Sequence, residues 1–193
     1  MSLRLVMLGT GSFALSTFQG LYETSHEIVG LVTQPDRTGR GHHKHVNLMK
    51  ELANEYETPV FQPVKANDPE SLGRLREFNA DLFVTAAYGQ ILSAELLSIP
   101  KSGAINVHAS LLPKYRGAAP IQFAIINGET ETGITIFRIE PKLDAGPILG
   151  VVRTDIGKKE TYGKLQDRLA ELAVPLTCKV VDDLAAGTVQ ESV

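Results

Sequence analysis

Asn106 and His108 stand two residues apart in a short apolar segment, 104–108, that has the pattern of a β-strand. Side chains alternate between the two faces of a strand, so this amide and this imidazole are expected on one side. Further along, Asp144 lies in a turn-forming segment, 142–147. An amide donor, a proton-carrying imidazole and a carboxylate that orients it are suited to acyl transfer. A single Asn or His at a strand end is more often structural, so the hypothesis requires all three to converge.

The surrounding chain alternates predicted strands with predicted helices. We expect parallel strands at 3–8, 27–33, 59–63, 81–87 and from 104, and helices at 47–56, 68–78, 121–126 and 161–186. Two further predicted strands, 132–139 and 148–155, are joined by a short turn. The sequence therefore predicts an α/β, Rossmann-like fold: a mainly parallel twisted sheet with helices on both faces and an antiparallel extension near the C-terminus. Pro175 is expected to kink or split the last helix.

Ligands of such sheets bind at the carboxyl ends of the strands. Residues 88–92 follow one predicted strand, and residues 106–113 include the end of the next. Both segments are therefore expected at the edge of the sheet where binding takes place.

The segment after the first predicted strand carries Gly9, Gly11 and Ala14, which match the relaxed dinucleotide-binding pattern G-x-G-x-x-A. That pattern also requires an acid at the end of the second strand, whereas Asp36 comes late and follows a proline. A tight turn that lets helix and strand pack closely is the favoured interpretation. A dinucleotide-binding oxidoreductase remains as an alternative.

A polar loop, 34–46, follows the second predicted strand. Its cations are Arg37, Arg40 and Lys44. A solvated loop is the simplest interpretation, and a basic segment that contacts nucleic-acid phosphates is the functional one. The loop also holds His42, His43 and His45, but we predict no metal site.

Composition limits the classes of protein that fit. The chain has 193 residues, 43% hydrophobic and 21% charged, which is ordinary for a globular domain. Its net charge of −3 argues against a surface that is basic throughout. We expect no membrane span, no signal peptide and, with Cys178 alone, no internal disulfide. These features predict a cytoplasmic protein.

The run NVHASLLPKYRGAAPI at 106–121 resembles the folate-dependent formyltransferases, and its YRGAAPI part is most similar to the methionyl-tRNA branch of that superfamily. The similarity extends over nearly the whole chain. Further matching runs are QPDR at 34–37, PVFQP at 59–63, AYGQIL at 87–92, TGITI at 132–136 and LDAG at 143–146.

The resemblance implies the donor, the acceptor and the roles of site residues. The formyl donor would be 10-formyltetrahydrofolate, with Asn106, His108 and Asp144 at the catalytic positions. The residues implied for folate binding are Gly89, Gln90, Ile91, Leu92, Ser110, Leu111, Leu112 and Pro113. The loop 34–46 would contact the acceptor stem of initiator methionyl-tRNA. No protein partner is predicted.

Two departures from the family pattern affect the acceptor. Family proteins are longer and carry a C-terminal tRNA-binding domain, so we expect residues 1–193 to be the catalytic domain with that second domain absent. Gly11 and Ser12 also stand where the family commonly has Pro followed by Asp or Glu. The alternatives that stay open are formyl transfer to an amino-sugar nucleotide or to glycinamide ribonucleotide, and a folate-binding module without activity.

Overall fold

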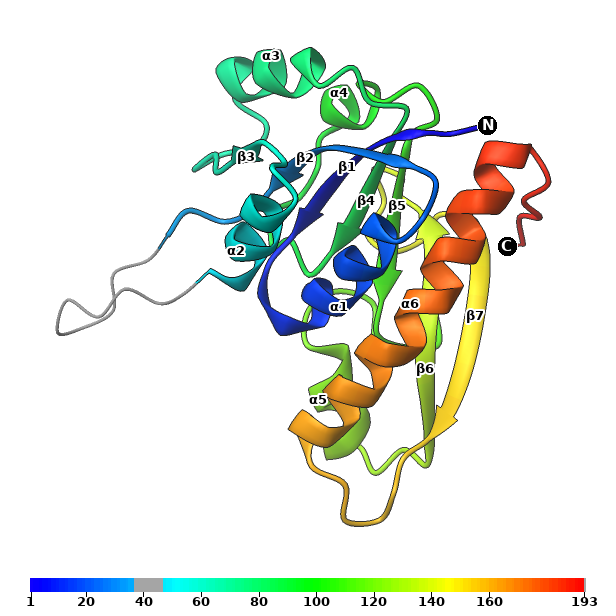
Figure 1. Cartoon of the computed structure of the whole chain (residues 1–193). Helices are drawn as coiled ribbons and strands as arrows, with labels where there is room; N and C mark the ends of the chain where they lie inside the picture. The colour runs from blue at the N-terminus through cyan, green and yellow to red at the C-terminus, as the bar shows by residue number, and fades with distance from the viewer. Residues whose placement is uncertain (37–46, 193) are drawn as a thin grey trace, which may run out of the picture.

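A computed structural model describes residues 1–36 and 47–192, and its strands form one sheet (Figure 1). The seven strands run in the order β3-β2-β1-β4-β5-β6-β7. Those that pair in parallel are β1 (Arg4–Gly9), β2 (Glu27–Val32), β3 (Val60–Phe61), β4 (Leu82–Ala86) and β5 (Ala104–His108). The strands β6 (Glu131–Arg138) and β7 (Ile148–Asp155) continue the sheet in antiparallel pairing. The predicted mainly parallel sheet with an antiparallel extension is confirmed.

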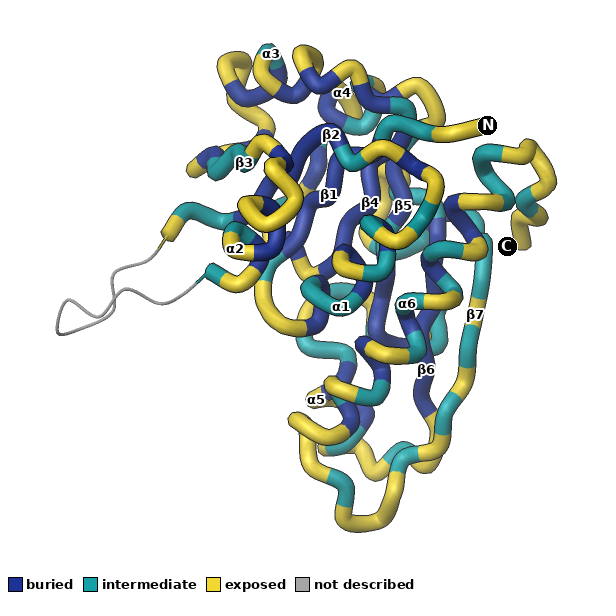
Figure 2. Tube along the Cα trace, in the orientation of Figure 1, coloured by how far each residue is buried: buried dark blue, intermediate teal, exposed yellow. Residues whose placement is uncertain are grey.

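Helices cover both faces of the sheet, as predicted. One face carries α1 (Gly11–Tyr22), α2 (Leu48–Glu55), α5 (Pro120–Ile126) and α6 (Tyr162–Ala186), and the other carries α3 (Pro69–Glu77) and α4 (Ala94–Leu97). The central strands β1, β4 and β5 lie between them and are buried on both sides (Figure 2). In β1, for example, Leu5 and Met7 pack toward α1, and Val6 and Leu8 pack toward α3. Burial on both sides explains why β1 is apolar at every position from Leu5 to Leu8 instead of alternating.

The long helix α6 packs along α1, with which it shares the larger of the two hydrophobic clusters. Its buried stripe includes Leu165, Leu169, Ala173 and Val180. Pro175 lies inside this helix, and the expectation that it would split the helix is wrong. A proline removes one backbone hydrogen bond, but the apolar stripe on both sides of it remains packed on the sheet and on α1.

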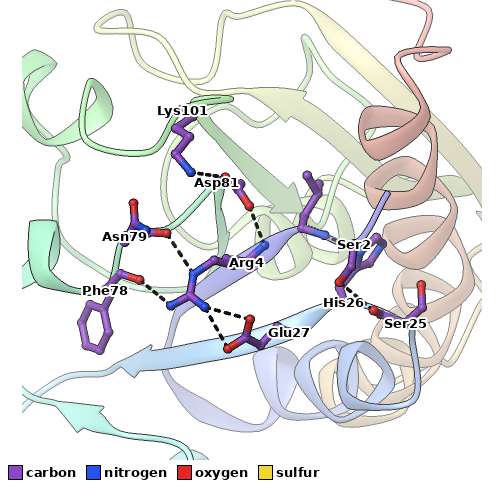
Figure 3. A network of polar contacts seen from close by, with 10 residues as sticks. Ser2, Arg4, Ser25, His26, Glu27, Phe78, Asn79, Asp81 and Lys101 are labelled. Atoms are coloured by element: carbon purple, nitrogen blue, oxygen red, sulfur yellow. Dashed lines mark hydrogen bonds and ion pairs between the residues drawn. The ribbon is translucent and has the colours of Figure 1, made fainter.

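A polar network ties the amino ends of β1, β2 and β4 together (Figure 3). The Arg4 guanidinium donates to the Glu27 carboxylate at 2.8 Å and to the Asn79 carbonyl at 3.1 Å. The Asp81 carboxylate accepts from the Arg4 backbone N–H at 2.9 Å and from the Lys101 ammonium at 2.8 Å. These two bonds hold the pKa of Asp81 below its usual range, and the bond from Lys101 has the larger effect. The network lies at the edge of the sheet opposite the carboxyl ends of these strands.

Among residues 1–36 and 47–192, no helix combines the length and the apolar character that crossing a membrane requires.

Candidate active site

Asn106 and His108 extend from β5 toward the face of the sheet that carries α3 and α4. Their neighbours Ile105 and Val107 point the other way, into the cluster with α1 and α6. Asn106 is half-buried and His108 is 6% exposed. Both side chains therefore project from the same face of β5, at the carboxyl end of this central strand.

The ring of His108 is held by a hydrogen bond at Nε2 and faces a carboxylate at Nδ1. Nε2 lies 2.8 Å from the backbone carbonyl oxygen of Tyr115. Because a carbonyl oxygen only accepts hydrogen bonds, Nε2 carries the hydrogen of the neutral ring. Nδ1 faces the Asp144 carboxylate, with Oδ2 at 3.8 Å. Nδ1 is therefore the ring nitrogen without a hydrogen in the neutral ring, and it is the one that faces the carboxylate.

Asp144 reaches His108 because the segment between β6 and β7 folds back toward β5. Its Oδ2 accepts a hydrogen bond from the Gly117 N–H at 2.6 Å, and its side chain is 13% exposed. The base of the segment is closed by a bond of 2.9 Å from the Arg138 N–H to the Pro147 carbonyl. The structure thus brings together the amide, the imidazole and the carboxylate that the sequence analysis singled out.

Residues 110–115 form a loop whose polar groups bond within the loop and to Thr135 of β6. Ser110 is fully buried, and its hydroxyl donates to the Lys114 carbonyl at 2.6 Å. The Thr135 hydroxyl donates to the Ser110 carbonyl at 2.7 Å and accepts from the Leu112 N–H at 3.1 Å. Leu111 and Leu112 are half-buried, and Pro113 is exposed. Ser110 therefore shapes this loop, and the loop presents apolar side chains at its surface.

The outer side of the same loop is fixed by Glu129. Its carboxylate accepts from the Tyr115 hydroxyl at 2.8 Å and from the Lys114 ammonium at 3.0 Å. The bonds from Lys114 and Tyr115 hold the pKa of Glu129 below its usual range, so the carboxylate is ionised near neutral pH. The bond from Tyr115 to Glu129 thus fixes Tyr115, whose backbone carbonyl accepts the hydrogen of His108 Nε2.

Residues 89–92 leave the end of β4 beside β5. Gly89 and Ile91 are exposed, Ile91 at 81%, whereas Leu92 is buried in the cluster with α3. The Gln90 side chain turns back into the protein and accepts from the Ala66 N–H at 2.8 Å. The Ile91 carbonyl accepts from the Asn67 side chain at 2.7 Å, so the groups that this segment offers to a ligand are the exposed Gly89 backbone and the apolar Ile91 side chain.

Strained backbone is concentrated around these segments. Six described residues other than glycine have positive φ angles. Four of them, Ala87, Tyr115, Ala119 and Asp144, belong to the segments that surround His108, with φ between 44° and 59°. Such conformations are costly for residues with a Cβ and are found at functional sites more than elsewhere.

A hollow of about 460 Å³ opens at the carboxyl ends of β1, β2 and β4, lined by residues 10–11, 34–36, 47–48 and 87–89. Gln34 crosses it by donating to the Tyr88 carbonyl at 2.8 Å. The Asp36 carboxylate accepts hydrogen bonds from Gln62 at 2.8 Å and from Lys50 at 3.1 Å. Both bonds lower the pKa of Asp36, and the bond from Gln62 has the larger effect. The hollow thus adjoins the 87–89 segment on the side away from β5.

Gly9, in the dinucleotide-like pattern, has a packing role. A Cβ there would lie 2.6 Å from the Phe18 ring and 2.8 Å from the Ala86 carbonyl oxygen. This supports the interpretation of a tight turn between a strand and a closely packed helix.

The predicted basic residues Arg37, Arg40 and Lys44 lie outside the described part of the chain, as do His42, His43 and His45. Within the described part, no group of three His, Cys, Asp or Glu side chains is arranged to hold a metal ion.

Sequence reasoning missed three residues that contact the candidate catalytic groups. Thr85 bonds to Asn106, the Tyr115 carbonyl to His108, and the Gly117 N–H to Asp144. Thr85 carried a signal, because it is the one polar residue in the apolar strand LFVTA. The other two act through backbone groups, which leave no trace in residue type.

Comparison with known proteins finds a matching family and similar relatives over nearly the whole chain. The family model described as formyl transferase matches residues 3–181. The methionyl-tRNA formyltransferase of Methylococcus capsulatus is 46% identical over 185 residues, which cover 95% of this chain and 60% of the relative. That of Geobacter sulfurreducens is 46% identical over 186 residues, covering 96% and 59%. The chain therefore spans about 60% of the length of these relatives.

A solved structure shows the same fold. Phosphoribosylglycinamide formyltransferase from Bacillus halodurans superposes with a TM-score of 0.81 over 95% of each chain, at 23% identity. At this identity the superposition supports the arrangement of the sheet and its helices.

Proposed function

The chain belongs to the formyl transferase family, and from this we propose that it transfers a formyl group from 10-formyltetrahydrofolate to the α-amine of initiator methionyl-tRNA. Two relatives at 46% identity are named for that acceptor. The observation that carries the proposal is the convergence of Asn106, His108 and Asp144 at one strand end, with Asp144 Oδ2 at 3.8 Å from His108 Nδ1. We also place the protein in the cytoplasm, where translation begins.

In the proposed reaction the acceptor amine attacks the formyl carbon of the donor. A C–N bond forms, and negative charge collects on the formyl oxygen. The Asn106 carboxamide donates a hydrogen bond to that oxygen, and one such donor stabilises a transition state by about 3–4 kcal/mol. The bond between the formyl carbon and folate N10 then breaks, and the formyl group remains on the acceptor.

The proton balance of this reaction assigns the part of His108. The amine loses one proton and folate N10 gains one. Nδ1 of His108 is the ring nitrogen free to take up a proton and release it, because Nε2 is bonded to the Tyr115 carbonyl. A placed acid–base group typically contributes about 10²–10⁴-fold. Asp144 stabilises the protonated ring and is itself oriented by the Gly117 N–H.

The donor is proposed to bind along segments 89–92 and 110–113. Gly89 is exposed, which suits its backbone to the hydrogen-bonding edge of a pterin, and the exposed Ile91 side chain together with Leu111 and Leu112 offers apolar surface to the flat face of the ring. Gln90 and Ser110 hold these segments from inside the protein, and Leu92 and Pro113 complete the proposed donor site.

The acceptor end is proposed to enter over the hollow beside residues 87–89. Arg37, Arg40 and Lys44 follow the Asp36 side of this hollow in sequence and are proposed to contact tRNA phosphates. Residues 1–193 would then be a catalytic domain, and further tRNA contacts would belong to the part of the relatives that this chain does not span.

The test is an acceptor comparison. The protein is incubated with labelled 10-formyltetrahydrofolate in three separate reactions, each with one candidate acceptor. The acceptors are methionyl initiator tRNA, a UDP-amino-sugar and glycinamide ribonucleotide. Label is expected on the methionyl-tRNA, and Asn106→Ala and His108→Ala are expected to lower kcat by about 10²-fold or more. Lys158→Ala, an exposed substitution in the turn after β7, is the control. Labelling of a different acceptor, or full turnover by His108→Ala, would refute the proposal.

A further inference from the structure

Thr85 is a polar residue in an otherwise apolar central strand. It is 3% exposed, and it pairs with Asn106 across the parallel strands β4 and β5. Partners across a parallel pair project to the same face of the sheet, so Thr85 lies directly beside the Asn106 side chain. A hydroxyl buried in this way requires a hydrogen-bond partner, and the identity of that partner decides what Thr85 does.

The partner is the Asn106 carboxamide. The Thr85 hydroxyl donates its one hydrogen to Asn106 Oδ1 at 2.7 Å, and the Ile105 carbonyl oxygen is a longer contact at 3.0 Å. The amide oxygen of Asn106 is therefore held against β4. Its nitrogen, which carries both hydrogens, is at the other end of the carboxamide and points away from that strand.

This orientation matters because the two ends of a carboxamide are opposite in function. Rotation of the terminal group by 180° exchanges a hydrogen-bond donor for an acceptor at nearly the same place. With its nitrogen outward, Asn106 stabilises negative charge on a formyl oxygen. With its oxygen outward, Asn106 would repel that charge. Because the Asn106 carboxamide is neutral, its orientation alone determines whether it stabilises or repels the charge on the formyl oxygen.

We propose that Thr85 is a positioning residue for formyl transfer: its hydroxyl holds the Asn106 carboxamide with the nitrogen directed at the reacting formyl oxygen. The inference rests on the proposed function, because it assigns a supporting residue to the same site. Thr85 itself does not touch the substrates. Its effect is a bias between two orientations of Asn106, and one buried hydrogen bond biases such an equilibrium by about 3- to 10-fold.

Thr85→Val and Thr85→Ser separate the hydroxyl from the shape of the side chain. Valine keeps the branched shape and removes the hydroxyl, and serine keeps the hydroxyl. We expect Thr85→Val to lower kcat by about 3- to 10-fold, with the KM for 10-formyltetrahydrofolate changed less than twofold, and Thr85→Ser to retain at least half of the wild-type kcat. Thr17→Val, a buried substitution in α1 on the other face, is the matched control and should leave kcat unchanged.

A double-mutant cycle tests whether Thr85 acts through Asn106. In the Asn106→Ala background, Thr85→Val should have no further effect on kcat, because the group that it orients is gone. Wild-type kcat for Thr85→Val, or the same fold-loss with and without Asn106, would overturn the proposal.

The orientation is also read directly, without an activity assay. The side-chain NH2 signals of Asn106 in a ¹⁵N-labelled sample are identified by their absence from Asn106→Ala. We expect one sharp pair in the wild type, and a shifted, broadened or doubled pair in Thr85→Val. Unchanged signals in Thr85→Val would overturn the proposal. If they change while the wild type formylates none of the acceptors, the proposed reaction fails and the orienting role of Thr85 stands.

Discussion

Gly146 controls the position of Asp144. Substituting Gly146 should displace the Asp144 carboxylate while Asn106, His108 and Asp144 themselves all remain present. The residue is buried in the turn between β6 and β7. A Cβ at this position would overlap the carbonyl oxygen of Arg138 and lie 3.0 Å from the carbonyl carbon. That carbonyl belongs to the backbone of β6, and the Arg138 N–H is bonded to Pro147 at 2.9 Å. Because the strand cannot rotate away, Gly146→Ala must displace the turn.

The size of the displacement follows from ordinary contact distances. The Cβ would overlap the Arg138 carbonyl oxygen, whereas a Cβ essentially never comes closer than 3.0 Å to another heavy atom, so the turn must move by about 1 Å or more. Asp144, two residues away, accepts from the Gly117 N–H at 2.6 Å and faces His108 at 3.8 Å, and both contacts change with the turn. A misplacement of about 1 Å at a reacting group costs up to about 10²-fold, so we expect kcat to fall by about 10- to 100-fold. Overpacking should also lower the free energy of unfolding by about 1–3 kcal/mol.

The assay is formyl transfer to methionyl-tRNA, measured well below the melting temperature of the variant so that only folded protein contributes. The KM for 10-formyltetrahydrofolate should change less than threefold, because the proposed donor segments lie elsewhere. Gly163→Ala is the matched control, because a Cβ there meets no atom within 4 Å and the position is helical. A folded Gly146→Ala protein with wild-type kcat would refute the assignment of Asp144 to catalysis.

Two further predictions concern stability. Since the pKa of Asp81 is lowered, its carboxylate stabilises the fold above the usual titration range of an aspartate, and this contribution is lost as the pH falls through the lowered value. Asp81→Asn should therefore lower the Tm at pH 7 by about 2–4 °C, for a loss of about 1 kcal/mol, and flatten its decline toward pH 3; a parallel curve would contradict this. The buried Tyr88 hydroxyl has no hydrogen-bond partner in the described structure, and burial raises its pKa to about 12. Tyr88→Phe should raise the Tm by about 2–4 °C, for a gain of about 1 kcal/mol, and a lower Tm would show that the hydroxyl is bonded.

Most of the fold could be predicted from the pattern of apolar residues. The predicted strand 132–139 corresponds to Glu131–Arg138, and the predicted helix 47–56 corresponds to Leu48–Glu55. These segments were identifiable because burial on one or two faces leaves a period in the sequence. Pro175 shows the limit of local rules, because its cost to the helix is offset by packing against α1 that no local pattern reveals.

The site was predictable in composition and only partly in geometry. The spacing of Asn106 and His108 was sufficient to place them on one face. The approach of Asp144 was not predictable from spacing, because it depends on a turn with φ of 44° that folds back over the sheet. The bond from Thr85 to Asn106 joins residues 21 apart in sequence and depends on the order and register of the two strands that carry them. The resemblance to the formyltransferases supplied roles for side chains but not these supporting contacts.

The order of the strands in the sheet has a consequence for the nascent chain. Residues 4–86 contain β1, β2, β3 and β4, which are neighbours, so this half of the sheet can assemble while later residues are still inside the ribosome. The side of this half that bears α1 is completed only when α6 emerges, because α6 supplies Leu165, Leu169 and Val180 to its cluster. Until then a large apolar surface stays open to solvent, and this interval is when the growing polypeptide has most need of a chaperone.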